Sequence, residues 1–470
     1  MKRWNLIVTG SMLGIVFIGG AIAATAADDL HQPSSVQQSV LSNGEYISMA
    51  PQADAGTASE SPSNKPATQT QAPPPPTPPA AGEAKAEAKD EAKEEPAPEE
   101  GPWKLFKGPC LDEYRIDIRG FADMGFTWNP DNPVNRFNGP VAYNDRSNEF
   151  EFNQLYLIME RVTKTDGCGV DIGGRVDLLY GTDRRFPVAY GLDSEWNLGH
   201  RFYGLDMPQA YGDLAINDLV LRGGHFLAPC GYESVMAVEN FFYSHSYGFL
   251  YGQPTTLTGG SAIYKVNDQV SVNVGLDTGW NDFTDPNNKV NYFGGFNWAS
   301  QDQKTTIAFE TFIGNTDPTP GVADCRTHYC FVLTQKIGEK WRYAFENNYG
   351  YDNNNPYKLG THGDWLSLAN YLFYDWNECW TFGIRYEWFD DDDGTVVQQV
   401  GPPTAGPIPA HYSELAVGLN WKPCQSKNLL VRTEIREDWA ADSAPVGARP
   451  FDAGAKNTQF LWATDVSVRF

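Results

Sequence analysis

Hydrophobic and polar residues alternate with a period of two along much of the chain after residue 101, and this pattern predicts β-strands. The clearest case is the end of the chain, 459–470, where Phe, Trp, Thr and Val fill the even positions and mainly polar residues the odd ones. The same alternation runs through 114–123, 270–277, 381–388 and 429–437. Each segment therefore has one apolar and one polar face, as a half-buried strand does.

Two architectures fit this alternation, and they differ in whether the apolar faces contact a protein core or lipid. In a soluble sandwich or barrel the apolar face forms the core and the polar face meets water. In a transmembrane barrel the apolar face meets lipid and the polar face lines the lumen. The apolar faces carry Trp and Tyr near the strand ends, as at Trp341, Trp388, Trp421 and Trp462. Aromatic girdles at the two membrane interfaces explain this distribution, so we expect a transmembrane barrel.

Short and long connections alternate between the predicted strands. The short connections are 164–169, 217–218, 267–269, 300–304, 338–340, 376–379 and 423–427. The long connections are 129–148, 181–207, 229–253, 281–288, 315–327, 352–362, 390–410 and 439–456. This order predicts an all-β fold, a transmembrane antiparallel up-and-down β-barrel of about 16 strands, with short periplasmic turns and long outer loops.

The chain ends on Phe470, which closes the last alternating strand. A terminal aromatic residue in this place resembles the signal that outer-membrane barrels present to the barrel-insertion machinery. We therefore expect Phe470 to be an assembly signal. The expected location is the outer membrane of a Gram-negative-type bacterium.

The first 102 residues differ from the rest of the chain and predict two segments that have no core. A basic start, a short apolar run and an Ala-Thr-Ala cleavage site form a secretory signal peptide over 1–26. Residues 27–102 are rich in Pro, Ala, Glu and Lys and have no apolar face, so we expect a disordered periplasmic linker. The outer-membrane barrel is predicted to span 103–470.

Composition and charge exclude several classes of protein. The formal net charge is −24, which makes nucleic acid a poor partner. The mean hydropathy of −0.44 excludes a membrane protein built from many spanning helices. Aromatic residues make up 13% of the chain, which is too many for a disordered acidic protein. A folded, anionic, aromatic-rich barrel satisfies all three observations.

One region resembles a known family. Residues 226–233 read FLAPCGYE, 240–247 read NFFYSHSY, 251–254 read YGQP, and 258–259 read TG. These segments resemble the OmpL-like beta-barrel porin family of outer-membrane proteins, with a match that extends over about 115–470. The resemblance implies a barrel that conducts small solutes. Gln253 and Cys230 depart from the acidic and aliphatic residues that the resemblance leads us to expect at these positions.

The polar faces of the predicted strands carry many charges, which a water-filled lumen tolerates and the lipid face does not. Several arginines precede an acid by two residues, at Arg175/Asp177, Arg385/Glu387 and Arg432/Glu434. Such pairs share one face, where they either order water and solutes or stabilise the wall. The predicted pore-lining residues are Arg115, Asp117, Arg119, Arg175, Asp177, Arg222, Arg342, Glu346, Arg385, Glu387, Arg432 and Glu434.

The long loop 229–253 is aromatic and Gly-rich and is the candidate constriction. A loop this apolar is poorly suited to bulk water, so folding into the lumen would bury it. The alternative is a loop folded over the mouth of the barrel. Its titratable residues Glu233, Glu239 and His245 are the candidate constriction residues.

The seven cysteines offer two places for disulfides, and no motif suggests an enzyme. Cys168, Cys379 and Cys424 all fall in short, periplasmic-side turns, where a pairing among them stays open. Cys325 and Cys330 share one outer loop and are the best candidates for a pair in an oxidising compartment. The acidic run 390–394 lacks the ligand spacing of a calcium loop. The histidines show no metal-binding spacing. We therefore expect no metal, no cofactor and no catalytic residue.

These observations predict an outer-membrane porin, a passive diffusion channel for small hydrophilic solutes that prefers cations. The alternatives are a substrate-selective sugar or peptide channel and a non-conducting surface or structural barrel. The expected partners are outer-membrane lipid, the barrel-insertion machinery, and small hydrophilic solutes and ions. A homotrimer and an approach of the linker to peptidoglycan remain open.

Overall fold

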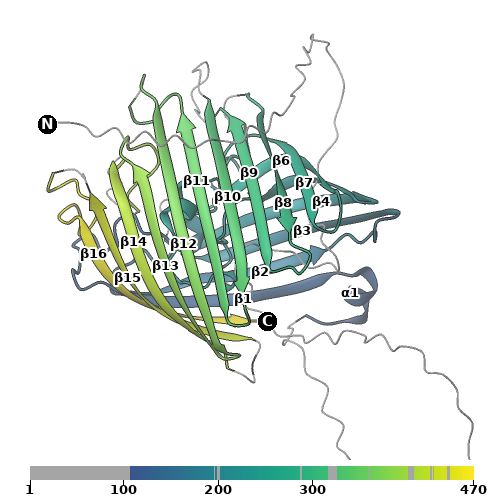
Figure 1. Cartoon of the computed structure of the whole chain (residues 1–470), viewed down its shortest axis with the longest axis horizontal. Helices are drawn as coiled ribbons and strands as arrows, with labels where there is room; N and C mark the ends of the chain where they lie inside the picture. The colour runs from purple at the N-terminus through teal and green to yellow at the C-terminus, as the bar shows by residue number, and fades with distance from the viewer. Residues whose placement is uncertain are drawn as a thin grey trace, which may run out of the picture. The chain divides into compact units, whose positions relative to one another are not determined.

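The computed structural model describes residues 106–470 except 195, 198–201, 286–287, 316–324, 359, 401–406, 424–425, 427 and 442–444. The predicted signal peptide and linker, 1–102, lie outside the described residues. The described chain forms a closed barrel of 16 antiparallel strands (Figure 1).

The strands follow one another around the barrel in chain order. They are β1 (Asp117–Trp128), β2 (Glu149–Arg161), β3 (Val170–Gly181), β4 (Gly204–Ile216), β5 (Leu219–Leu227), β6 (Thr256–Lys265), β7 (Val270–Asp277), β8 (Asn291–Ala299), β9 (Thr305–Gly314), β10 (Arg326–Ile337), β11 (Trp341–Asp352), β12 (Gly363–Asn377), β13 (Trp380–Asp391), β14 (Ala410–Trp421), β15 (Leu429–Ala441) and β16 (Thr458–Arg469). The short helical elements are α1 (Pro109–Tyr114), η1 (Asp183–Arg185), η2 (Ala237–Glu239) and α2 (Tyr247–Tyr251).

The first and last strands close the barrel. Strand β1 pairs with β16 from Phe121↔Arg469 to Trp128↔Trp462, so every strand has two hydrogen-bonded neighbours. Closure removes the unpaired edges that lipid does not tolerate. The predicted fold, strand number and alternation of short and long connections are confirmed.

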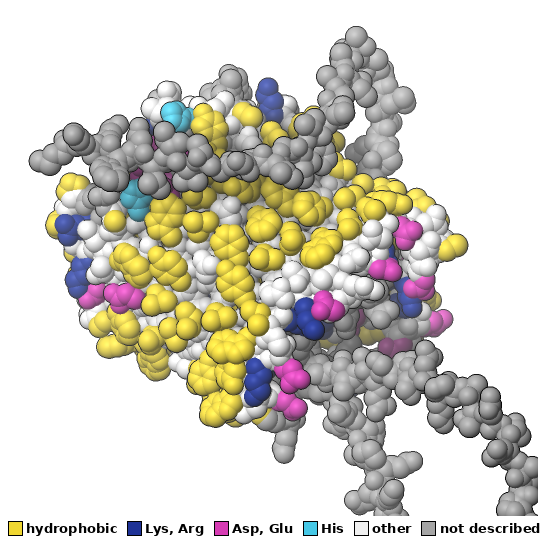
Figure 2. Space-filling view, in the orientation of Figure 1, with side chains coloured by type: hydrophobic (Ala, Val, Ile, Leu, Met, Phe, Trp, Pro, Cys, Tyr) yellow, Lys and Arg dark blue, Asp and Glu magenta, His cyan; other side chains and the backbone are white. Residues whose placement is uncertain are grey.

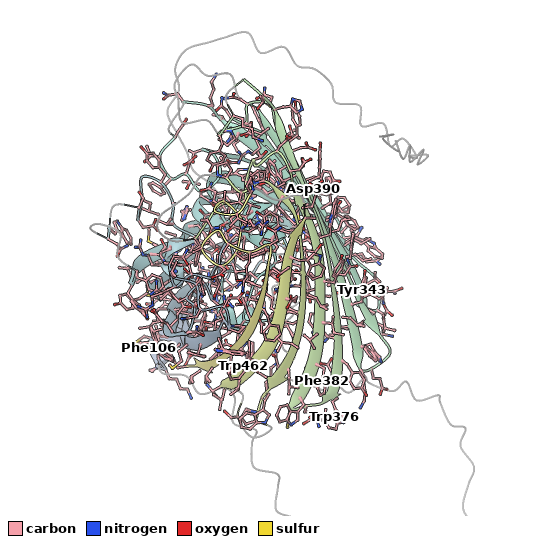
Figure 3. All side chains as sticks on the ribbon, turned by 90° about the vertical axis from the view of Figure 1, so that its left-hand side faces the viewer. Phe106, Tyr343, Trp376, Phe382, Asp390 and Trp462 are labelled. Carbon is pink, nitrogen blue, oxygen red and sulfur yellow. The ribbon has the colours of Figure 1, made fainter. Side chains whose placement is uncertain are left out.

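The outer surface of the wall is apolar. Figure 2 shows hydrophobic side chains over most of the visible wall, with charged ones toward its margins. In Figure 3, Trp376 and Phe382 lie at the end where β12 turns into β13, and Asp390 lies toward the opposite, long-loop end. The rings of Trp376 and Phe382 are 5.8 Å apart, as expected for an interfacial aromatic belt. None of the described helices is long and apolar enough to span a membrane.

The predicted strand over 114–123 begins later than expected, and this corrects one pore-lining residue. Helix α1 ends at Tyr114, and Arg115 takes the left-handed conformation (φ 57°) that terminates it. Strand β1 therefore starts at Asp117, and Arg115 lies outside the wall. Its guanidinium bonds to Asp171 at 2.7 Å, with 42% of the side chain exposed.

The interior of the barrel is packed with side chains. Buried apolar clusters join wall strands to the loop between β5 and β6, residues 228–255, which we call the inner loop. Its buried aromatic residues include Tyr232, Phe241, Phe242, Tyr247 and Phe249. Burying such rings removes a large apolar area from water, which favours this loop inside the barrel.

Candidate functional site

Glutamates of the wall hold the backbone of the inner loop. The carboxylate of Glu434 on β15 accepts hydrogen bonds from the amides of Tyr243 at 2.9 Å and Ser244 at 3.1 Å. Glu346 on β11 accepts one from the Tyr232 amide at 2.9 Å. Charged acceptors make the stronger kind of hydrogen bond, and these satisfy loop amides that water does not reach.

Glu387 on β13 holds the start of helix α2. Its two oxygens accept hydrogen bonds from the amides of Tyr247 at 2.6 Å and Gly248 at 2.7 Å. The Ser367 hydroxyl donates a third bond to Glu387 at 2.7 Å. Gly248 is needed here because a Cβ would lie 2.5 Å from the Ser367 oxygen.

Arg432 on β15 holds the loop through its carbonyl groups. Its Nη1 donates to the carbonyl oxygens of Ala237 at 2.6 Å, Asn240 at 2.8 Å and Phe242 at 3.2 Å. The same guanidinium pairs with Asp465 of the neighbouring strand β16. The planar guanidinium of arginine has several N–H donors in fixed directions, so it can bind a carboxylate and backbone carbonyl groups at the same time.

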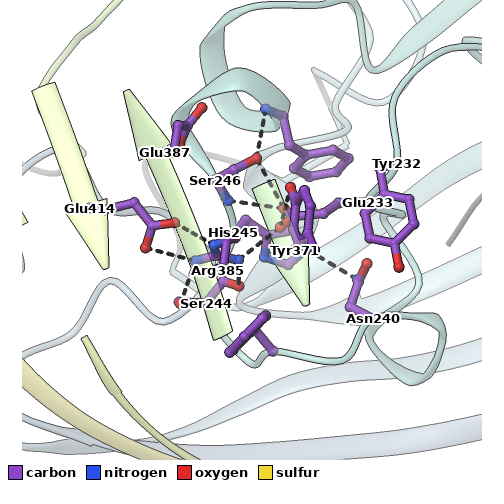
Figure 4. Close-up of polar contacts among 12 residues, drawn as sticks. Tyr232, Glu233, Asn240, Ser244, His245, Ser246, Tyr371, Arg385, Glu387 and Glu414 are labelled. Atoms are coloured by element: carbon purple, nitrogen blue, oxygen red, sulfur yellow. Dashed lines mark hydrogen bonds and ion pairs between the residues drawn. The ribbon is translucent and has the colours of Figure 1, made fainter. Parts of the chain in front are cut away.

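Arg385 on β13 is the centre of the contact between loop and wall (Figure 4). Its guanidinium donates to Glu233 of the loop at 2.7 Å and to Glu414 of the wall at 2.5 Å. It also donates to the carbonyl and the hydroxyl of Ser244 at 2.8 and 2.9 Å. Glu233 accepts a further bond from the Tyr371 hydroxyl at 3.2 Å. Arg385 and Glu414 are fully buried, so this ion pair excludes water.

His245 lies within the loop between two aromatic rings. Its ring centroid is 4.1 Å from Tyr143 and 4.7 Å from Phe249, and both pairs are stacked. Its Nε2 lies 3.2 Å from the Ser234 carbonyl oxygen. Burial lowers the pKa of His245 to about 4, so the ring is neutral at pH 7.

The predicted wall residues apart from Arg115 all lie on strands, but their pairing differs from the expectation. Arg175 and Asp177 do pair on one strand at 2.7 Å. Arg385 instead pairs with Glu414 of the neighbouring strand and Glu233 of the loop, and Arg432 pairs with Asp465 of the neighbouring strand. The carboxylates two residues further on, Glu387 and Glu434, accept hydrogen bonds from amides of the inner loop. Cross-strand neighbours lie closer together than residues at i and i+2 on one strand.

The remaining predicted wall residues lie away from this centre. Arg119 bonds to Asp117 and Glu160 at 2.7 and 2.6 Å. Arg342 bonds to Asp375 at 2.9 Å, and Arg222 bonds to Asp213 at 3.0 Å. Glu239, the other predicted loop acid, accepts a bond from Ser234 at 2.9 Å.

Sequence reasoning missed several residues that complete the site. Glu414 and Asp438 are fully buried partners of Arg385 and Arg436, and Arg436 also donates to the His245 carbonyl at 2.6 Å. Their signal in the sequence was an acid at an inward position of an alternating strand. The fold was needed to select them, since many acids share that pattern.

The predicted disulfide between Cys325 and Cys330 is wrong. Both thiols are free. Cys330 points inward from β10 while Cys325 precedes the strand, and five residues of extended chain span roughly 16 Å. A disulfide requires Cα atoms closer than about 7 Å. Cys379, in a short turn, is disulfide-bonded.

Three possible metal ligands meet at the long-loop end of the wall, which the sequence spacing did not show. Ligand atoms of Asp390, Asp392 and His411 lie within 4.8 Å of one another. The His411 Nδ1 lies 2.6 Å from Asp390, across a directly paired position of β13 and β14. A histidine–aspartate hydrogen bond accounts for two of these three side chains.

Comparisons with known proteins concern the fold and the family of the chain. The anion-selective porin from Comamonas acidovorans superposes with a TM-score of 0.51 at 11% identity, covering 76% of this chain and 99% of that one. The outer membrane channel DcaP of Acinetobacter baumannii gives a TM-score of 0.49 at 10% identity, covering 76% and 97%. No curated protein matches the chain. The family model described as "Putative beta-barrel porin-2, OmpL-like" matches residues 115–470, so the chain belongs to this family of outer-membrane β-barrel porins.

Proposed function

We propose that the protein is a narrow passive channel for ions and small hydrophilic solutes, with the inner loop as its constriction. The observation that carries the proposal is the set of hydrogen bonds that hold the loop against β11, β13 and β15. These bonds keep a long loop inside the lumen rather than outside the barrel. No step of such a passage requires a cofactor or catalysis.

The burial of the wall supports a small bore. Arg385 and Glu387 are fully buried, and Glu434 is 4% exposed. Side chains on a wide water-filled channel would be open to water. We therefore expect a low single-channel conductance and exclusion of large solutes.

The charges inside the barrel support a preference for cations, because a passage lined mainly by one sign concentrates counter-ions. Acidic residues outnumber arginines about three to one among the buried charged residues of the strands. The acids are Asp123, Glu151, Glu160, Asp177, Asp206, Asp213, Asp277, Glu310, Glu346, Asp352, Glu387, Asp391, Glu414, Glu434, Asp438 and Asp465, and the arginines are Arg175, Arg222, Arg385, Arg432 and Arg436. The anion-selective porin named above shares only the fold, so its selectivity does not bear on this chain.

Reversal potentials across a KCl gradient in planar bilayers test the preference. K⁺ should permeate more readily than Cl⁻, and the ratio should fall as salt rises and screening shortens. Replacing Glu233 and Glu239 with Gln should lower the ratio, since Arg385 then keeps its charge without its loop partner. Glu437→Gln, on the outer face of β15, is the matched control. An anion-selective sign would refute the charge argument, and an unchanged ratio in the double variant would remove the loop from the ion path.

A non-conducting barrel is the second candidate, and the packed interior is the observation that favours it. Stepwise currents from the purified protein support the channel, whereas a silent bilayer with correctly folded protein supports the plugged barrel. A substrate-selective channel for sugars or peptides is the third. It predicts currents that a specific sugar or peptide blocks at low concentration.

The proposal extends to assembly and export. Residues 1–26 would be a cleaved signal peptide, 27–102 a periplasmic linker that approaches peptidoglycan, and Phe470 the signal for the insertion machinery. A homotrimer is the proposed assembly, and light scattering on the detergent-solubilised protein measures it. The mass of a single chain per micelle would contradict the trimer.

A further inference from the structure

Two cysteines distant in the sequence meet inside the barrel. Cys230 begins the inner loop, and Cys330 points inward from β10. The amide of Gly231, which follows Cys230, donates to the Cys330 Sγ at 3.3 Å. Cys330 is 2% exposed, and Cys230 packs against the apolar cluster that contains it.

Covalent geometry limits how far apart the two side chains are. An amide nitrogen lies about 2.4 Å from the preceding Cα, so the Cys230 Cα lies within about 5.7 Å of the Cys330 Sγ. The Cys330 Sγ lies about 2.8 Å from its own Cα, so the two Cα atoms lie within about 8.5 Å of each other. This limit includes the Cα–Cα distances of ~4.4–6.8 Å that disulfides span. The Cys230 Sγ lies 3.9 Å from the Pro254 carbonyl oxygen, so formation of the bond requires the Cys230 side chain to rotate away from this contact.

The compartment favours oxidation of such a pair. Chains destined for the outer membrane cross the oxidising periplasm. Cys379 of this chain is disulfide-bonded, whereas Cys230 and Cys330 have free thiols in the structure. We propose that Cys230 and Cys330 form a disulfide in the mature protein and thereby join the inner loop covalently to the wall at β10.

The reaction transfers two electrons to a periplasmic protein disulfide. A Cys230 or Cys330 thiolate attacks the oxidant and forms a mixed disulfide, and the second thiolate then displaces the oxidant as a dithiol. Two S–H bonds are lost, one S–S bond forms, and the two protons and two electrons end on the reduced oxidant. Burial raises the pKa of the Cys230 thiol, so the reaction is fastest before the loop packs.

The covalent bond would change what the loop can do. The hydrogen bonds from β11, β13 and β15 hold the loop by contacts that can break and reform. A disulfide at β10 would fix the start of the loop permanently. The loop could then rearrange within the lumen but could not leave it.

Counting free thiols tests the proposal without any conductance measurement, so it stands apart from the proposed function. Cells that express the full chain are treated with N-ethylmaleimide, which tags free thiols. The protein is denatured in this reagent without a reductant, and the number of tags is read from its intact mass. If the bond exists, C230S carries one tag more than wild type, because Cys330 is released. The reciprocal variant C330S also gains one tag.

A control variant and two contradicting outcomes complete the test. C325S removes an exposed free thiol and should lose one tag. A loss of one tag in C230S, as in this control, would overturn the proposal. A gain of one tag in C230S together with a loss of one tag in C330S would also overturn it, because Cys230 would then be bonded to a different cysteine. Because serine enters an apolar cluster, C230A and C330A provide a second pair that tolerates this environment.

Discussion

Arg385→Met offers the most direct test of how the inner loop is held. The substitution keeps an unbranched, flexible side chain and removes the guanidinium with its charge and all its donors. Glu233 and Glu414 then remain buried without the guanidinium that lies 2.7 and 2.5 Å away. The carbonyl of Ser244 loses a donor as well.

The expected cost follows from these contacts. Removing one partner of a buried ion pair costs about 3–5 kcal/mol, because the remaining charge is left uncompensated. Arg436 stays 3.7 Å from Glu414, which places the cost near the lower end. About 3 kcal/mol shifts the equilibrium between docked and released loop by a factor of roughly 10². The wall should persist, since its strand pairing does not involve Arg385 side-chain atoms.

Single-channel recordings and limited proteolysis of the folded barrel measure this shift. The Arg385→Met channel should visit larger open levels, and a protease should cut within 231–255 at a faster rate. Arg119→Met is the matched control, because Arg119 bonds to the wall residues Asp117 and Glu160. Wild-type conductance and wild-type protease resistance in Arg385→Met would refute the claim that this arginine holds the loop.

Further predictions concern topology, assembly and pH. Single cysteines placed in 390–410 should react with impermeant reagents on intact cells and those in 423–427 should not; the reverse pattern would invert the barrel. Deleting Phe470 should impair outer-membrane assembly, and Phe470→Ala, which keeps the backbone bonds to Gly120, should do so too if the ring is the signal; normal insertion of both would remove that role. Because the pKa of His245 is lowered to about 4, docking of the loop should weaken by up to about 3 kcal/mol as pH falls from 6.5 to 4. Proteolysis at pH 4.5 and 7.5 measures this, and an equal pH effect in His245→Gln would contradict it.

Much of the fold was predictable from local pattern. Lipid on one side and a polar lumen on the other impose period-two alternation on every strand, so the segments 381–388 and 429–437 read clearly as strands. Connection lengths then gave the strand number and the two ends of the barrel. The start of β1 was the exception, because alternation over 114–117 looked like strand where a left-handed Arg115 ends a helix.

The pairing inside the lumen was not predictable in the same way. Alternation showed that Arg385, Glu387 and Glu434 face inward, but not which partners they meet. The partners come from other strands and from the inner loop, more than 100 residues away in the case of Glu233 and Arg385. Contacts between residues so far apart in the sequence depend on barrel closure and strand register, which the spacing of residues in the sequence does not reveal.

The sequence by itself determined the strands, the barrel and the alternation of short and long connections, because those features follow from the solvent each face meets and from the up-and-down strand order. Tertiary structure alone decided that the inner loop is held in the lumen by Glu434, Glu387 and Arg385. It also decided that Cys330 lies against the inner loop next to Cys230, where the Gly231 amide donates to its sulfur, and is not bonded to Cys325. The physical reason is that a buried polar group must find a partner wherever the closed barrel brings one within hydrogen-bonding distance.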